Sequence, residues 1–194
     1  MVGLVLAAGC ASGGGGGGGG EGDAALLVGE IDEAAPPVGE INEDGEFVSE
    51  SLGYALRPPA GWTLVSTQVD RGVTIVLIAS PEGTSGLQVN AGQASADIQE
   101  RIEAEGEEAL EEIAREFAEG NESVDAESCR MIELSSGQSA AVMDLVPEDE
   151  VSGGRFLIAV GNDSVYAMTL GLGTDATDID NTADAVVESF RILD

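Results

Sequence analysis

The sequence predicts an α+β domain over residues 47–194, in which an antiparallel β-sheet is sandwiched by helices. Two observations lead to this fold class. Apolar and β-branched residues form short runs bounded by Gly, Pro, Asn and Asp, as in strands joined by tight turns. Two amphipathic segments, one central and one C-terminal, have the period of helices. Strands grouped apart from helices favour an antiparallel sheet over alternating βαβ units.

The first group of predicted strands precedes the central helix. These strands lie at 47–48, 52–57, 62–69, 73–79 and 87–91. Pro58 and Pro59 end the second strand because proline cannot donate to the ladder. The run at 73–79 consists of β-branched and apolar residues throughout, which is typical of a central strand.

The central segment predicts one long helix from Ser95 to Phe117. The Ser95 hydroxyl can cap its N terminus by accepting from an amide two or three residues later. Apolar residues then recur at intervals of three and four, which leaves one face to bury. The other face is rich in glutamate, and Glu111 and Arg115 have the spacing of an i, i+4 ion pair.

The last part of the chain predicts more strands and a closing helix. The strands lie at 129–134, 138–146, 155–161 and 164–171. Asn162 and Asp163 separate the last two, and both residue types tolerate the positive φ of a tight hairpin turn. Thr177 begins the closing helix, with Asp180 at the capping-box position.

Two short motifs carry a family resemblance. The run Tyr54-Ala-Leu-Arg-Pro-Pro-Ala-Gly-Trp62 resembles the opening of PsbP-like domains, and Val187-Glu-Ser-Phe190 is similar to their closing helix. The resemblance covers residues 47–194. It implies an α/β/α sandwich around an antiparallel sheet, and a family with many secreted or lipid-anchored members without known catalysis. No functional residue of the family matches a motif in this chain.

The N terminus resembles a lipoprotein signal. An apolar run, residues 1–9, precedes Cys10, and Leu6-Ala-Ala-Gly-Cys10 resembles the lipobox, in which the cysteine becomes the lipidated first residue. The alternative is a short buried strand, or a tail that ends in an ordinary cysteine. Because no basic residue precedes the apolar run, we expect the signal peptide to begin upstream of Met1.

Residues 10–46 predict a disordered linker behind the lipid-attachment cysteine. Eight consecutive glycines, Gly13–Gly20, have no side chain to bury, and the acidic stretch after them repels itself. Within this stretch VGEIDE at 28–33 recurs as VGEINE at 38–43. The repeat is either a duplicated linker segment or a short binding motif.

Composition excludes several functions. The chain of 194 residues has 37 acidic and 7 basic residues, a net charge of −30, which excludes an electrostatic nucleic-acid binder. It contains no histidine, and all seven basic residues are arginines. Without histidine, the chain cannot form a Ser-His-Asp triad, a Cys-His dyad or a histidine-ligated zinc site. Without lysine, it cannot form a Schiff base or a P-loop. Cys129 lies with Met131 in an alternating predicted strand, so we expect it to be a buried core residue rather than a reactive thiol.

Carboxylates are the remaining catalytic resource. A paired-carboxylate hydrolase needs an aromatic or apolar cleft that raises one pKa, and the chain has only seven aromatic residues. Two acidic clusters, 148–150 and 175–180, offer oxygen ligands to a hard cation but lack the spacing of a calcium loop. We expect both clusters to be solvated surface, with no metal and no cofactor.

We therefore expect a lipid-anchored lipoprotein on the outer side of the cell membrane, held there by Cys10. Its PsbP-like domain would be a non-catalytic module that binds an unknown envelope protein or ligand. The alternative is a carboxylate-only hydrolase or a cation-binding accessory protein. The acidic, lysine-free composition fits an extreme halophile, or a high-GC bacterium with acidic secreted proteins.

Overall fold

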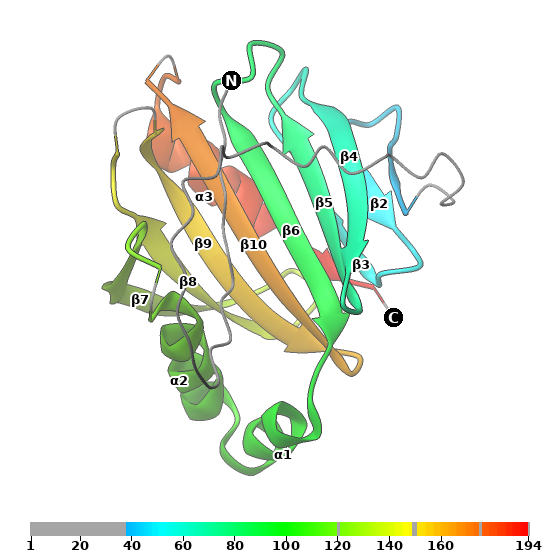
Figure 1. Cartoon of the computed structure of the whole chain (residues 1–194), viewed down its shortest axis with the longest axis vertical. Coiled ribbons are helices and arrows are strands. Elements are labelled where there is room, and N and C mark those ends of the chain that lie inside the picture. The colour runs from blue at the N-terminus through cyan, green and yellow to red at the C-terminus, as the bar shows by residue number, and fades with distance from the viewer. Residues whose placement is uncertain (1–37, 120, 149–150, 175, 194) are drawn as a thin grey trace, which may run out of the picture.

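The computed structural model describes residues 38–194 except 120, 149–150, 175 and 194 (Figure 1). Its strands are β1 (Glu40–Ile41), β2 (Phe47–Ser49), β3 (Tyr54–Leu56), β4 (Thr63–Asp70), β5 (Val73–Ala79), β6 (Gly86–Gln93), β7 (Val124–Glu133), β8 (Ser139–Leu145), β9 (Val151–Gly161), β10 (Ser164–Gly173) and β11 (Arg191–Ile192). Its helices are α1 (Ala96–Glu105), α2 (Glu107–Ala118) and α3 (Ile179–Ser189).

The strands form two antiparallel sheets. The large sheet has seven strands in the order β4-β5-β6-β10-β9-β8-β7, and the small sheet has four in the order β1-β2-β3-β11. The antiparallel architecture predicted from the sequence is confirmed. The C-terminal strand β11 was not predicted, because two residues next to a helix carry too little periodicity to recognise.

The two faces of the large sheet are covered differently. On one face, α3 and the small sheet together enclose the main core (Figure 1). On the other face, α2 packs over β7, β8 and β9 with a second cluster, and α1 has no buried residue. The expected α/β/α sandwich is therefore correct only in part. The fold is mostly β, because fully buried side chains of the small sheet, such as Phe47 and Leu56, occupy much of one layer.

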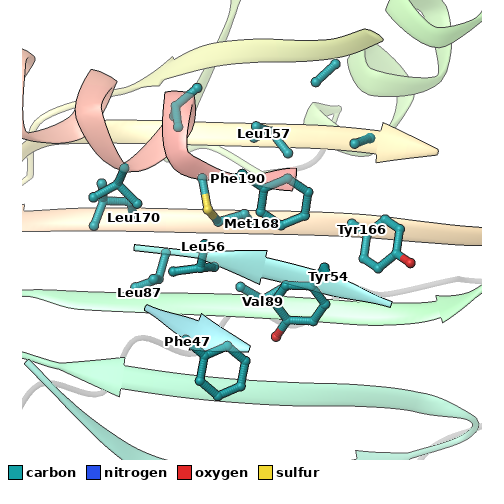
Figure 2. Packing of buried hydrophobic residues seen from close by; sticks show 14 of the residues in the cluster. Phe47, Tyr54, Leu56, Leu87, Val89, Leu157, Tyr166, Met168, Leu170 and Phe190 are labelled. Atoms are coloured by element: carbon teal, nitrogen blue, oxygen red, sulfur yellow. The ribbon is translucent and has the colours of Figure 1, made fainter. Parts of the chain in front are cut away.

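An aromatic cluster forms the centre of the main core. Figure 2 shows Phe47, Tyr54, Tyr166 and Phe190 packed together from strands of both sheets and the end of α3. Tyr54 stacks on Phe190 with ring centroids 5.6 Å apart. Tyr166 contacts both rings edge-on, with its centroid 5.7 Å from that of Tyr54 and 5.9 Å from that of Phe190. These contacts join the small sheet to the large one.

The two tyrosines of this cluster should respond oppositely to loss of their hydroxyls. The Tyr54 hydroxyl is buried without a hydrogen-bond partner among the described residues, whereas that of Tyr166 donates to the Leu52 carbonyl at 2.9 Å. We expect Tyr54→Phe to raise the free energy of unfolding by about 1 kcal/mol and Tyr166→Phe to lower it by about as much. Urea unfolding at pH 7 measures both, and a destabilised Tyr54→Phe would contradict the expectation.

The same pair predicts a loss of stability in alkali. Burial raises the pKa of Tyr54 and of Tyr166. Both groups therefore ionise first in the unfolded chain, near pH 10. Their contribution is fully present below that pH and is lost as the pH rises above it. Tyr54→Phe should lessen this loss between pH 10 and 11.

The central helix differs from its prediction. One helix from Ser95 to Phe117 is wrong, since Gly106 adopts φ 62° and ψ −124° and separates α1 from α2. The Ser95 cap is confirmed, with its hydroxyl accepting from the Ile98 amide at 3.3 Å. Positive φ values of 51° and 60° at Asn162 and Asp163 confirm the hairpin turn.

Both ends of the described domain also differ from expectation. The helix α3 begins at Ile179, and its N-cap Asp178 makes no capping hydrogen bond through its side chain. The capping box predicted with Asp180 is wrong, because that carboxylate accepts from Arg155 instead. At the other end, β1 lies before the predicted domain start at Phe47. The small sheet therefore includes residues that the sequence assigned to the linker.

Candidate functional site

An uncharged region of the large sheet contrasts with the acidity of the rest of the chain. The face that α2 covers over β8 and β9 continues onto β10, β6, β5 and β4, the side turned to the viewer in Figure 1. Cross-strand pairing aligns three rows there, which are Thr169, Gln88, Leu77 and Ser66; Ala167, Asn90, Ile75 and Gln68; and Val165, Gly92, Val73 and Asp70. Only Asp70 is charged among these twelve residues. We call this region the open face.

The open face ends at β4, which is an edge strand of the large sheet. Among the described residues, β5 is the only strand paired with β4. Val65 and Val69 are 57% and 68% exposed. At Val65 the register with β5 skips a residue, so this residue has no partner in the ladder. An exposed apolar edge with unpaired backbone groups is a template for a further strand.

The opposite edge of the same sheet is protected. Strand β7 has a register shift between Asp125 and Arg130, and charged side chains stand along it. Arg115 of α2 also donates to the carbonyl oxygen of Ala126 at 2.7 Å, which satisfies one of the edge acceptors. Bulges, charges and covering helices are the usual means of blocking an edge. None of the residues from Trp62 to Val69 is charged.

The largest network of ion pairs among the described residues lies elsewhere, where α3 meets β8 and β9. Arg155 is 7% exposed and donates to Asp184 at 2.9 Å and to Asp180 at 3.0 Å. Its ion pair with Asp144 measures 3.4 Å, and Arg130 joins Asp144 and Asp184 at 3.2 Å. Burial lowers the pKa of Arg155, but these carboxylates outweigh it and the pKa is raised. Each carboxylate already has an arginine partner, so the network fastens α3 to the sheet.

The structure places the sequence-derived candidates apart from one another. Cys129 is half-buried against the α2 cluster, and burial raises the pKa of its thiol. Glu148 accepts from the Ser123 hydroxyl, and Asp178 accepts from Asn181. Three members of the acidic clusters, Asp149, Glu150 and Asp175, lie outside the described residues, as does Cys10.

Two further findings concern metals and membranes. In the part of the chain that the structure describes, no three side chains of Cys, Asp or Glu are grouped as metal ligands would be. None of the described helices has the length and apolar character needed to span a bilayer. Four of the seven aromatic residues are fully buried in the cluster of Figure 2, where they line no surface cleft.

Comparison with known proteins identifies the fold. No family model and no curated protein matches the sequence. The solution structure of cyanobacterial PsbP (CyanoP) from Synechocystis sp. PCC 6803 is similar with a TM-score of 0.54 and 14% identity, over 85% of this chain and 98% of CyanoP. A crystal structure from Bacteroides thetaiotaomicron VPI-5482 is less similar, with a TM-score of 0.39 and 12% identity over 77% of this chain and 48% of that one. The likeness to CyanoP supports the PsbP-like fold that the sequence motifs predicted.

Proposed function

We propose that this protein is a non-catalytic binding module, anchored by lipid to the outer side of the cell membrane, which holds an envelope protein at β4. The observation that carries the proposal is the difference between the two edges of the large sheet. Strand β7 has charged side chains along it and an arginine of α2 bound to its backbone, whereas β4 has neither between Thr63 and Val69 and shares only a register shift, at Val65. In a chain of net charge −30, eight uncharged residues on an exposed edge require an explanation.

Strand addition explains the features of β4 and the open face together. An extended segment of the partner would pair with the free backbone groups of β4, and main-chain hydrogen bonds supply affinity in this mode. Side chains of the segment that point toward the open face would meet Ser66 and Gln68, and those on the other face would meet Leu64 and Val69. Because Asp70 is the only charged residue among the twelve of this surface, the segment that fits it is itself uncharged and rich in β-branched residues.

Photo-crosslinking in intact cells tests the binding edge. A photoreactive residue at Val69 should give one discrete adduct, and adding Val65→Lys should reduce its yield at least about tenfold, because an edge lysine blocks strand pairing. The matched control is Ala104→Lys, which makes the same charge change at an exposed position of α1. An adduct that persists with Val65→Lys would refute binding at β4.

The anchor is tested separately. Native protein should have a mass that corresponds to a lipid-modified Cys10 at its N terminus, and Cys10→Ser should move the protein from the membrane fraction to the soluble one. Unmodified native protein that starts at Met1 and stays with the membrane would contradict a lipid anchor while leaving the β4 edge untouched.

A further inference from the structure

The short strand β1 is held by specific contacts with β2. Glu40 and Ile41 pair with Val48 and Phe47, and Ile41 packs against the main core. The Val38 carbonyl accepts from the Ser49 hydroxyl. We call the surface formed by Phe47, Val48 and Ser49 the β1 site.

The β1 site accepts only certain residues. A Cβ atom on Gly39 would lie 2.5 Å from Cζ of Phe47 and 2.6 Å from the Val48 carbonyl oxygen, so glycine is required there. The side chain of Asn42 accepts from the amides of Asp44 and Glu46 at 3.0 Å, which closes the turn into β2. The site itself therefore needs a glycine and an isoleucine two residues later, whereas Asn42 serves the turn.

A second segment of the chain meets both of these requirements. Residues Val28-Gly-Glu-Ile-Asp-Glu33 repeat Val38-Gly-Glu-Ile-Asn-Glu43 with one change, Asp32 for Asn42. Glycine and isoleucine stand where the β1 site needs them. We propose that the segment 28–33 of the same chain exchanges with 38–43 in the β1 site.

The two occupants differ in how they connect to β2. Residues 44–46 join the present occupant to β2, whereas residues 34–46 would join the upstream copy. Lengthening a flexible loop from three residues to thirteen disfavours its closure roughly ninefold. The hydrogen bonds from the Gly45 amide to the Asn42 carbonyl and from the Asp44 and Glu46 amides to the Asn42 side chain, all at 3.0 Å, also belong to the short turn alone. The downstream copy is thus the main occupant and the upstream copy the minor one.

Exchange would alter the length of chain that precedes the domain. When the upstream copy is bound, the chain between Cys10 and the β1 site is ten residues shorter, which is at most about 35 Å of extended chain. This consequence rests on the proposed anchor at Cys10, whereas the exchange itself does not. Residues 28–33 would thereby act as a second β1 strand, and its binding would shorten the distance that the domain can reach from the anchor.

Hydrogen exchange of the full chain, read by mass spectrometry, tests the proposal. In the unmodified protein the amide of Asn42, which donates to the Glu46 carbonyl at 2.9 Å, should be the protected one. Gly39→Val expels the downstream copy, and protection should move to the peptide that contains residues 28–33. Exchange there should be at least about tenfold slower than in the double variant Gly29→Val/Gly39→Val. Gly29→Val alone is the matched control and should leave protection at 38–43 unchanged.

Each other outcome overturns the exchange. If Gly39→Val leaves 28–33 as unprotected as the double variant does, the upstream copy does not enter the site. If protection stays at 38–43 in Gly39→Val, the glycine is not required. Protection of 28–33 that rises with protein concentration would mean that a second molecule supplies the strand.

Discussion

Arg155→Met is expected to lower the free energy of unfolding by about 3 kcal/mol. Arg155 is the most extensively paired cation among the described residues, with Asp144, Asp180 and Asp184 all within 3.4 Å. Breaking a buried ion pair costs about 3 to 5 kcal/mol. The lower end applies because the aspartates are partly exposed and can be hydrated after the arginine is lost.

The measurement is urea unfolding at pH 7 and 0.15 M KCl. Arg101→Met is the matched control, because Arg101 also pairs with two acids, Glu112 and Glu116, but on the exposed surface between α1 and α2. Exposed pairs contribute little, so this control should unfold close to the parent protein. Equal losses for the two variants would show that the number of pairs matters more than burial.

Stability is expected to rise steeply with KCl. The chain has 37 acidic and 7 basic residues, and acids crowd both α1 and α2. Two like charges about 10 Å apart in water repel by about 0.4 kcal/mol. Between 0.1 and 1 M salt the Debye length falls from about 10 Å to about 3 Å, which removes most of this repulsion. Summed over many pairs, the gain should be on the order of 2 to 4 kcal/mol.

The test is the urea midpoint of the chain from residue 11 onward at several KCl concentrations. Chloride salts out weakly, so a rise already present below 1 M reflects screening rather than stronger apolar burial. Sodium sulfate at equal ionic strength is the comparison that measures the apolar contribution. A midpoint that stays flat or falls with KCl would mean that like-charge repulsion is not the main destabilising term.

The sequence by itself determined the elements whose causes are local. A continuous run of β-branched and apolar residues made β5 recognisable from Val73 to Ala79, and the residue types at Asn162 and Asp163 specified a hairpin turn. The absence of histidine and lysine also excluded whole classes of catalysis without any structure. The motifs beginning at Tyr54 and ending at Phe190 predicted the PsbP-like fold.

Only the tertiary structure decided the features that depend on contacts distant in sequence. Asp180 carries the pattern of a capping box, but Arg155 on β9 binds it at 3.0 Å, and a charge-assisted hydrogen bond to a buried guanidinium outweighs a local cap. Strand β1 lies in an acidic stretch with little local propensity for a strand, and it is ordered because Ile41 packs against the main core. Likewise, nothing in the run from Trp62 to Val69 distinguishes an edge strand from a central one. Its role as a candidate binding edge follows from the order of strands, which is set by packing across the whole sheet.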